Sequence, residues 1–485
     1  MRDLSFFGRK NELESLASLT QKKVSSLLVI RGRRRIGKSR LVKEFAKKYR
    51  FLSFAGLPPT PKTTAQSQRN VFAEQLATHL HLPKLHATDW GVLFSFLAKE
   101  TQQKTQQGRV VILFDEISWM GSKDPDFLGK LKHAWDTEFS ENPELMLILC
   151  GSVSAWIEEN ILKSTGFMGR LSLVLDLNEL SVPECNQFFK GIGFRGNAYE
   201  KFKILSVTGG IPRYLEEIKS DRSADENIKE LCFVKHGVLL REFKEIFLDI
   251  FARRSVMYQK IVDSLVSGGK EFSDIVSELD QSKGGRFSEY LSDLVLSGFI
   301  SRDHTWNIKE GKASALSHYR LSDNYLRFYL KYIAPNLNKI EGKHFEHQSL
   351  SVLLGFESIM GLQFENMILN NRDFIWEKLH LYPSEIITNN PYFQRPQLRK
   401  RGCQIDYLIQ TKANVLYACE IKFLRQEIQS DILDEMKKKI ADFYLPRGFS
   451  IMPVLIHVNG VSEAVIESGY FSHIIDFKEL LERSY

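Results

Sequence analysis

The sequence predicts an α/β chain with a parallel sheet in its N-terminal half and a second α/β unit near its C-terminus. Three observations predict this class: a glycine-bounded loop between an apolar run and a helical pattern, a second apolar run that ends in two acids, and a late pair of strand-like runs that carry carboxylates. At 485 residues the chain is too long for one hydrophobic core, so two to four domains are expected.

Composition narrows the class of protein. Hydrophobic residues make up 43% and charged residues 26%, which is typical of globular chains. The five cysteines are odd in number and lack C-x-x-C spacing, which argues against a disulfide framework and a structural zinc site. Early charged residues exclude a secretory segment, and no apolar run reaches membrane-spanning length, so we expect a cytoplasmic protein without a membrane partner.

The net charge of +7 is unevenly distributed. Residues 1–50 hold a net charge of +11, and the rest of the chain a net charge of −4. The basic excess therefore belongs to the N-terminal end, and the total charge gives little support for DNA binding.

The glycine-bounded loop follows the apolar run Ser26–Gly32 and precedes a helical pattern at Lys38–Tyr49. Glycines allow backbone amides to curl around a phosphate, lysine reaches the β- and γ-phosphates, and the serine hydroxyl is a Mg²⁺ ligand. Strand, loop and helix together are the context of a P-loop, so the sequence predicts binding of ATP with Mg²⁺. The predicted loop residues are Gly32, Arg33, Arg34, Arg35, Ile36, Gly37, Lys38 and Ser39.

A second apolar run, residues 110–116, ends in Asp115 and Glu116 and is typical of a strand buried on both faces. We expect Asp115 to hold Mg²⁺, largely through water, and Glu116 to orient or deprotonate the attacking water. The alternative is a solvated strand end.

Three further strands are expected at Arg50–Ala55, Leu145–Ser152 and Leu171–Leu177, with helices around residues 67–80, 90–105 and 126–140. Ser152 ends a strand where a hydroxyl can meet the γ-phosphate or the attacking water. Arg170 precedes the last strand and is a candidate for phosphate contact. An ordinary turn serine and a surface arginine are the alternatives.

The opening F-G-R-K-N-E-L, the G-R-R-R-I-G-K-S loop, L-F-D-E-I-S-W, C-G-S and T-G-G-I-P-R-Y resemble the archaeal ATPase family of the AAA+/STAND branch over about the first half of the chain. The resemblance implies that Gly8 and Arg9 flank the adenine, that Ser152 is a sensor, that Arg170 is a finger-like arginine and that Pro212 lies in a helical lid. We also count Arg40 among the nucleotide-binding residues.

With this resemblance we predict a P-loop NTPase core with five parallel strands in the order 5-1-4-3-2, then a helical lid, a winged helix-turn-helix, and an α/β restriction-endonuclease-like domain. The expected boundaries are 1–178, 179–250, 251–335 and 342–485.

The middle of the chain has short helices at Val256–Val266, Phe272–Leu279 and Gly285–Leu296, then a hairpin around residues 300–321, which is the winged-helix layout. In a DNA-binding version, Arg286, Ser288 and Tyr290 face the groove. Residues 253–303 hold seven Lys/Arg and eight Asp/Glu, however, so packing between domains or binding of a partner is an equal alternative.

Two strand-like runs near the C-terminus are centred on residue 413. A tight hairpin there makes Asp406 and Glu420 cross-strand neighbours. Lys422 shares their face by the two-residue period. Two adjacent carboxylates repel unless a cation lies between them, which predicts a Mg²⁺ site with a lysine beside it.

These residues resemble the D and E-x-K pattern of the PD-(D/E)xK nuclease superfamily. The resemblance implies that Glu365 supplies a further metal-binding acid from a helix. The basic cluster Arg395, Arg399, Lys400 and Arg401 is a candidate for the DNA backbone. A solvated hairpin, or a fold that has lost its chemistry, is the alternative, since residues 342–485 hold sixteen Lys/Arg and eighteen Asp/Glu.

Three functions follow. The first is an ATPase switch that controls the C-terminal part. The second is a metal-dependent DNA nuclease regulated by ATP, and the third is a nucleotide-gated DNA or protein tether without cleavage. The expected cofactors are ATP and Mg²⁺, DNA is a candidate partner, and homo-oligomerisation is left open.

Overall fold

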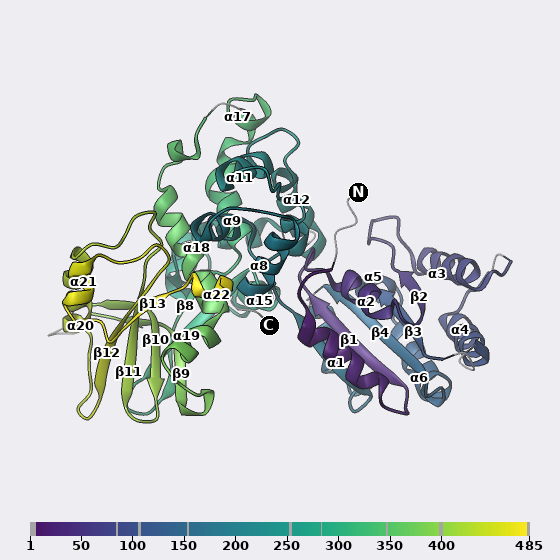
Figure 1. Ribbon diagram of the computed structural model, residues 1–485. Helices are drawn as coiled ribbons and strands as arrows, with labels where there is room; N and C mark the ends of the chain where they lie inside the picture. Colours follow the sequence, from purple (N-terminus) through teal and green to yellow (C-terminus); the bar gives the residue numbers. More distant parts are fainter. Residues whose placement is uncertain are drawn as a thin grey trace. The chain divides into compact units, whose positions relative to one another are not determined.

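The computed structural model describes residues 6–83, 86–104, 108–152, 155–251, 255–282, 284–345, 348–396 and 401–482. The chain divides into two compact units (Figure 1). One unit is Gly8–Glu179, and the other joins Met1–Phe7 to Leu180–Tyr485. Below, each unit is described by itself. The finer division of the second unit at residues 251 and 335 stays a prediction.

The first unit holds a five-stranded parallel sheet in the order β2-β3-β4-β1-β5. Counted from the opposite edge this is 5-1-4-3-2, so the predicted order is confirmed. Apolar side chains bury the central strands on both faces, as expected for a parallel sheet covered by helices. The strands are β1 (Ser26–Gly32), β2 (Arg50–Ala55), β3 (Val110–Asp115), β4 (Leu145–Ser152) and β5 (Leu171–Leu177).

Helices in this unit alternate with the strands (Figure 1). One continuous core joins β2 and β3 to the helices beside them, and stacked or edge-on aromatic rings fill it, including Phe54, Phe72 and Phe114. The helices are α1 (Lys10–Thr20), α2 (Lys38–Ala46), α3 (Ala65–Leu80), α4 (Trp90–Lys104), α5 (Ile117–Gly121), α6 (Phe127–Thr137) and α7 (Ala155–Ile157), the last continuing into a π-helical turn at Glu158–Leu162.

The second unit begins with helices. Ser181 and Glu184 form a capping box at the start of the first of them, with the Ser181 backbone N–H donating to Glu184 at 2.8 Å. The helices are α8 (Val182–Gly191), α9 (Ala198–Thr208), α10 (Pro212–Leu215), α11 (Ala224–Cys232) and α12 (Val238–Phe251).

The next segment places three helices before an antiparallel hairpin, in the order that the sequence predicts. The helices are α13 (Ser255–Ser264), α14 (Phe272–Glu278) and α15 (Gly285–Leu296). The hairpin is β7 (Ile300–Asn307) and β8 (Lys312–Leu321), and the short β6 (Lys270–Glu271) pairs with β8 to complete a three-stranded sheet.

The C-terminal sheet is mixed, in the order β13-β12-β11-β10-β9. β9 to β11 pair antiparallel, whereas β11 to β13 pair parallel. The strands are β9 (Ile386–Gln394), β10 (Cys403–Thr411), β11 (Val415–Ile421), β12 (Ser450–His457) and β13 (His473–Asp476). The accompanying helices are α16 (Asn324–Phe328), α17 (Leu337–Glu341), α18 (Phe356–Asn370), α19 (Arg372–Lys378), α20 (Asp431–Asp442), α21 (Glu463–Glu467) and α22 (Glu479–Glu482).

The β7–β8 hairpin packs against the C-terminal sheet. Trp306 and Ile308 are 3% and 4% exposed and belong to the same hydrophobic core as residues of β10 and β11. The Trp306 indole N–H donates to Gln410 at 2.6 Å, and the Gln410 amide donates to the Ile308 carbonyl at 2.8 Å. One face of this hairpin therefore packs within the chain, whereas Arg302 of β7 and Lys312 of β8 are exposed.

An aromatic layer joins α9 to the C-terminal part. The rings of Tyr199 and Phe423 stack with centroids 4.8 Å apart, and Phe423 stacks in turn on Phe364 of α18 at 5.0 Å. Phe202 and Phe477 extend the layer. Helix α9 therefore packs on α18, on the residue that directly follows β13 and on the residue two positions after β11.

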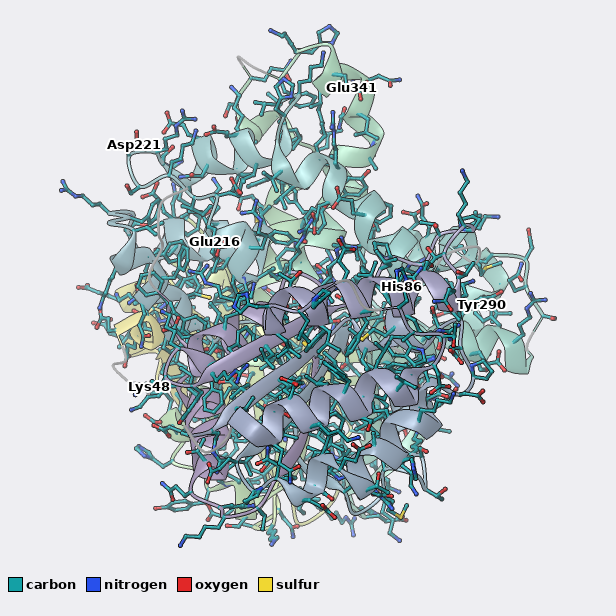
Figure 2. All side chains as sticks on the ribbon, turned by 90° about the vertical axis from the view of Figure 1, so that its right-hand side faces the viewer. Lys48, His86, Glu216, Asp221, Tyr290 and Glu341 are labelled. Atoms are coloured by element: carbon teal, nitrogen blue, oxygen red, sulfur yellow. The ribbon has the colours of Figure 1, made fainter. Side chains whose placement is uncertain are left out.

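Charged side chains, such as those of Lys48, Asp221 and Glu341, lie at the surface (Figure 2). No described helix combines the length and the apolar character that a membrane crossing requires. The five cysteines are buried, and none of them forms a disulfide among the described residues.

Replacing Trp306 tests the packing of the hairpin. Trp306→Ala is expected to lower the free energy of unfolding by about 3–5 kcal/mol, because it removes a buried aromatic side chain. Trp306→Phe is expected to cost less, about 1–3 kcal/mol, because it takes away the indole partner of a buried amide. Urea denaturation measures both. Tyr382→Phe, at a side chain 72% exposed, is the control, and an effect of Trp306→Ala no larger than that of the control would contradict buried packing.

Candidate functional site

The loop between β1 and α2 has the backbone that a phosphate cradle needs. A Cβ on Gly32 would lie 2.6 Å from the Leu177 carbonyl oxygen, so the chain passes too close for any side chain there. Gly37, with φ of 90°, turns the chain into α2, which begins at Lys38. Ile36 is buried, whereas Arg33, Arg34, Arg35 and Arg40 are partly exposed.

Lys38 folds back over this loop. Its side chain is buried, and its ammonium group donates to the carbonyl oxygens of Gly32 and Arg33 at 3.0 Å each. A lysine held across the mouth of a glycine-bounded loop is in place to meet a phosphate group, so the loop fits the triphosphate that the motif implies.

Ser39 and Asp115 meet beside the loop. The Ser39 hydroxyl donates to Asp115 Oδ2 at 2.6 Å, and the backbone N–H of Glu116 donates to Asp115 Oδ1 at 3.2 Å. Glu116 has φ of 54°, a left-handed conformation that is uncommon for residues other than glycine, and α5 starts directly after it. The structure therefore places Asp115 against Ser39 of the loop, with Glu116 next in the chain.

Ser152 ends β4 at the same edge of the sheet. In the parallel register Gly32 pairs with Ser152, so the serine lies next to the start of the loop. Its hydroxyl is buried and has no hydrogen-bond partner among the described residues. A buried hydroxyl without a partner is costly, and a bound phosphate or water would satisfy it.

Cys150 lies behind this group. Burial raises the pKa of its thiol, and the Asp115 and Glu116 carboxylates raise it further, whereas Lys38 lowers it. The thiol is therefore neutral, and the three charged groups face one small region at the ends of β3 and β4.

Arg9 holds the loop from the other side. It is 5% exposed, and its guanidinium donates to the carbonyl oxygens of Ile36 at 3.3 Å and Asn178 at 2.5 Å, and to Glu12 at 3.0 Å. Gly8, with φ of 71°, precedes it. The contact of Gly8 and Arg9 with adenine stays a prediction. The clamp on Ile36 was not foreseen, because its partners are backbone atoms distant in sequence.

Other charged groups near the sheet are engaged with carboxylates. Arg170 donates to both oxygens of Asp136, at 2.6 and 3.0 Å, and this pair lowers the pKa of Asp136 to about 2. Arg31, one residue before the loop, pairs with Glu158 at 2.6 Å and with Asp176. The sequence did not predict these ion pairs of Arg31, although a charged residue inside an apolar run was a signal that it needs a partner.

Pro212 belongs to the second unit, where it opens α10 after Ile211. Its predicted place in a lid over the nucleotide stays a prediction.

The C-terminal hairpin has the predicted register. Tyr407 pairs with Cys419 and Gln410 with Leu416, which continues to Asp406 opposite Glu420. Asp406 accepts the backbone N–H of Ile421 at 3.0 Å. Glu420 is 1% exposed, and Glu365 lies on α18 close enough to influence Asp406 and Glu420 electrostatically.

Burial changes the ionisation of these acids. It raises the pKa of Asp406 to about 6, with a further increase from Glu365. It raises the pKa of Glu420 to about 7, with a further increase from Asp406. Burial also raises the pKa of Glu365, against the attraction of Arg320 and Arg327. The three carboxylates therefore stand close together in a poorly solvated site.

Lysines supply the positive charge. Lys422 lies 3.0 Å from Glu420 Oε1 and donates to Glu435 at 2.9 Å. Lys439, on α20, donates to Glu420 Oε2 at 2.6 Å and lies 3.7 Å from Asp406 Oδ1. Lys439 was missed, because its place beside the hairpin depends on helix packing. Among the residues described, no three His, Cys, Asp or Glu side chains are arranged to hold a metal ion.

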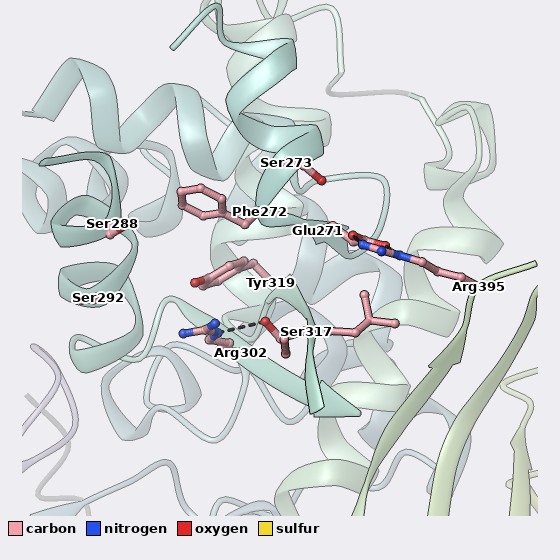
Figure 3. Close-up of a pocket in the computed structure, with 11 residues that line it drawn as sticks. Glu271, Phe272, Ser273, Ser288, Ser292, Arg302, Ser317, Tyr319 and Arg395 are labelled. Atoms are coloured by element: carbon pink, nitrogen blue, oxygen red, sulfur yellow. Dashed lines mark hydrogen bonds and ion pairs between the residues drawn. The ribbon is translucent and has the colours of Figure 1, made fainter. Parts of the chain in front are cut away.

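A pocket of about 470 Å³ lies between α14, α15 and the β7–β8 hairpin (Figure 3). Ser288 and Arg302 line it, and Arg302 donates to Ser317 at 3.0 Å. Arg395 closes one side through an ion pair with Glu271. Of the other predicted backbone-binding residues, Arg401 is exposed, while Arg399 and Lys400 lie outside the described residues. Arg286 is exposed, and Tyr290 packs edge-on against Tyr258.

Residues 6–218 match the family model of an ATPase domain found predominantly in Archaea. An uncharacterized protein of Methanocaldococcus jannaschii is 24% identical over 398 residues, which is 80% of this chain and 82% of that protein. The first part of the chain is thus an ATPase domain of the archaeal P-loop type.

Two solved structures are similar to this chain in part. The Walker-type ATPase of Pyrococcus abyssi is 17% identical with a TM-score of 0.49, and the similarity covers 68% of this chain and 97% of that one. The ORC2 protein of Aeropyrum pernix is 13% identical with a TM-score of 0.43, over 71% of this chain and 96% of that one.

Serine hydroxyls at the site should differ in their effect on stability. Ser39→Ala is expected to lower the free energy of unfolding by about 1.5–3 kcal/mol, because its hydroxyl bonds to a carboxylate. Ser152→Ala removes a buried hydroxyl without a partner, so stability should be unchanged or should rise by up to about 1–3 kcal/mol. Urea denaturation without nucleotide compares the two, and a larger loss for Ser152→Ala would show that its hydroxyl already has a partner.

Proposed function

We propose that this chain is an ATP-driven switch that binds and slowly hydrolyses ATP in the unit Gly8–Glu179 and so controls the state of its C-terminal part. The ATPase domain itself follows from the family match. The single observation that supports the proposed chemistry is the contact of Ser39 with Asp115 at 2.6 Å, next to a loop across which Lys38 is folded.

The residues of the site divide the work. ATP supplies the phosphoryl group and Mg²⁺ the charge that neutralises its oxygens. Lys38 and the loop amides would hold the phosphates, and Ser39 and Asp115 would hold the metal ion. Glu116 positions water and takes its proton, and Ser152 donates its hydroxyl to phosphate or water. Arg170 takes part only after it leaves Asp136.

Control of the C-terminal part is proposed to run through the helices after residue 180. These helices would form a lid of the kind found in the AAA+/STAND branch, with Pro212 as the first residue of one of them. The aromatic layer of Tyr199, Phe423 and Phe364 supports this route. It ties α9 to the residues that directly follow Lys422 and precede Glu365.

Residues 251–335 are proposed to form a winged helix that serves domain packing. Its β7–β8 hairpin, the wing, is buried against the C-terminal sheet through Trp306 and Ile308. Because one face of the wing is used for this packing, we assign any DNA contact of this segment to α15, where Arg286 is exposed.

A second candidate function is a metal-dependent DNA nuclease of the PD-(D/E)xK type, with ATP as its regulator. The observation in its favour is the pairing register that sets Asp406 opposite Glu420, with Lys422 beside it and Glu365 nearby. In this candidate the three acids bind Mg²⁺ and Lys422 steadies the attacking hydroxide.

The third candidate keeps ATP binding but has no cleavage, so that the chain tethers DNA or a protein. Its support is the balanced charge of residues 342–485, with sixteen Lys/Arg and eighteen Asp/Glu, which favours a protein over DNA as the tethered partner. A cytoplasmic location belongs to all three proposals, since buried cysteines that form no disulfide among the described residues suit a reducing compartment. Assembly of several copies is left open.

Lys38→Ala tests ATP binding. We expect the dissociation constant for ATP to rise by about 10- to 100-fold or more, because a charge-assisted contact to phosphate is lost. Fluorescence titration with a labelled ATP measures it, and circular dichroism checks the fold. Lys43→Ala is the matched control, since Lys43 lies on the same helix and is exposed. Equal ATP affinity of Lys38→Ala and wild type would refute the assignment.

Glu116→Gln separates hydrolysis from binding. The variant should bind ATP as wild type does, while the turnover rate falls by about 10²–10⁴-fold, the usual contribution of a general base. Phosphate release at saturating ATP and Mg²⁺ measures this. Unchanged turnover would remove Glu116 from the chemistry.

Asp406→Asn tests the nuclease candidate. That candidate expects wild type to cut linear DNA with Mn²⁺ or Mg²⁺, and the variant to lose about 10²-fold or more in rate, because a metal ligand is gone. Gel electrophoresis of the products decides it. Asp431→Asn, at an exposed residue that begins α20, is the matched control. Equal cutting by Asp406→Asn and wild type would exclude this site, and cutting by neither favours the third candidate.

A further inference from the structure

The facing carboxylates of the C-terminal hairpin already have a cation between them. The Lys439 ammonium donates to Glu420 Oε2 at 2.6 Å and lies 3.7 Å from Asp406 Oδ1. It also lies 3.9 Å from Glu435 Oε1, one helical turn earlier. A point charge at these distances from two acids on adjacent strands stands where a divalent ion would have to bind both.

The lysine is held in this place by its helix. Ile432 and Met436 of α20 are 2% and 0% exposed, and Phe443, directly after the helix, is 1% exposed. These residues recur at the three- and four-residue spacing that sets them, with Lys439, on one face of the helix. The Lys439 carbonyl also accepts the thiol of Cys403 on β10 at 3.3 Å. Lys439 is thus held both at its backbone carbonyl and at its ammonium group.

Lys422 occupies the other oxygen of the same acid. It lies 3.0 Å from Glu420 Oε1 and donates to Glu435 at 2.9 Å. Both oxygens of Glu420 therefore face ammonium groups, and Asp406 accepts a backbone N–H through Oδ2. This agrees with the lack, in the described ranges, of any group of three potential ligand residues placed for a metal ion.

We infer that Lys439 is the resident cation of this site and that it competes with divalent metal ions for Asp406 and Glu420. Two buried carboxylates neutralised by a fixed ammonium group gain little from a second cation, and a metal ion must first displace the lysine. The site as folded is a closed ion-pair network. Metal binding becomes favourable only when Lys439 is withdrawn or removed.

The inference does not depend on the ATPase proposal, and it constrains the nuclease candidate, because metal-dependent cleavage then requires a step that moves Lys439. Its test measures metal binding and stability. It therefore gives an answer whether or not the protein cuts DNA or hydrolyses ATP.

The experiment titrates the nucleotide-free full-length chain with Mn²⁺ and follows bound Mn²⁺ by electron paramagnetic resonance. Lys439→Met keeps an unbranched side chain, one atom shorter than that of lysine, and removes its charge. We expect the dissociation constant for Mn²⁺ at the site of Asp406 and Glu420 to be at least about tenfold lower in Lys439→Met than in wild type, because the competing cation is gone. The variant should then show one more occupied site than wild type at the same Mn²⁺ concentration. Adding Asp406→Asn to Lys439→Met should abolish the gain.

Lys437→Met is the matched control. Lys437 lies on the same helix, pairs only loosely with Asp434 at 3.7 Å, and is 56% exposed, so its removal should leave Mn²⁺ binding as in wild type. Equal affinity of Lys439→Met and wild type, or a gain that survives Asp406→Asn, would overturn the inference.

Thermal unfolding gives a second readout. Without metal, Lys439→Met should unfold at a lower temperature than Lys437→Met, since its carboxylates lose their partner, and Mn²⁺ should restore part of the loss. If Lys439→Met does not fold, comparison of the Tm of wild type and of Asp406→Asn with and without Mn²⁺ still tests the inference. A rise in the Tm of wild type at micromolar Mn²⁺ that Asp406→Asn lacks would show that the metal binds with Lys439 present, against the inference.

Discussion

The parallel register of three neighbouring strands is the constraint on which the nucleotide site depends. β4 lies between β1 and β3, and the register pairs Gly32 with Ser152 and Phe114 with Leu149. The carboxyl ends of the strands therefore reach one edge together. The loop after β1, the acids that end β3 and the serine that ends β4 are brought together by this alignment, although more than a hundred residues separate the first from the last.

The same sheet explains why charge appears only at its edge. The strands before that edge are apolar and fully buried, so an ionised group within them would lose its hydration without a partner. Cys150 lies where the apolar part of β4 meets the charged groups, and burial raises the pKa of its thiol, which stays neutral. Beyond it, Lys38 donates to loop carbonyls, Asp115 accepts from Ser39, and Arg9 donates to the carbonyl oxygens of Ile36 and Asn178.

The C-terminal unit follows the same rule with a different result. Its charges are buried more deeply and are paired within the protein, Glu420 with two lysines and Arg320 with Asp303 at 2.9 Å. Arg327 is fully buried and donates to the Leu321 carbonyl at 2.8 Å. The Arg320 pair lies between the β7–β8 hairpin and α18, which carries Glu365, since Arg320 also donates to Asn366 of α18. A nucleotide site keeps donors available for a ligand, whereas here the protein supplies the counter-charges itself.

The sequence by itself determined the elements and their local chemistry. The apolar run Ser26–Gly32, its glycine-bounded loop and the acids after Phe114 predicted a parallel sheet with a phosphate site, because strand burial and phosphate binding both rest on neighbours in sequence. The turn at residue 413 likewise set the hairpin register, since a tight turn leaves one pairing. Only the tertiary structure decided which distant groups meet. The pairing of Arg170 with Asp136, the clamp of Arg9 on Ile36, the burial of Trp306 and the arrival of Lys439 between Asp406 and Glu420 all depend on how separate elements pack, and side-chain contacts across such packing leave no periodic signal in the chain.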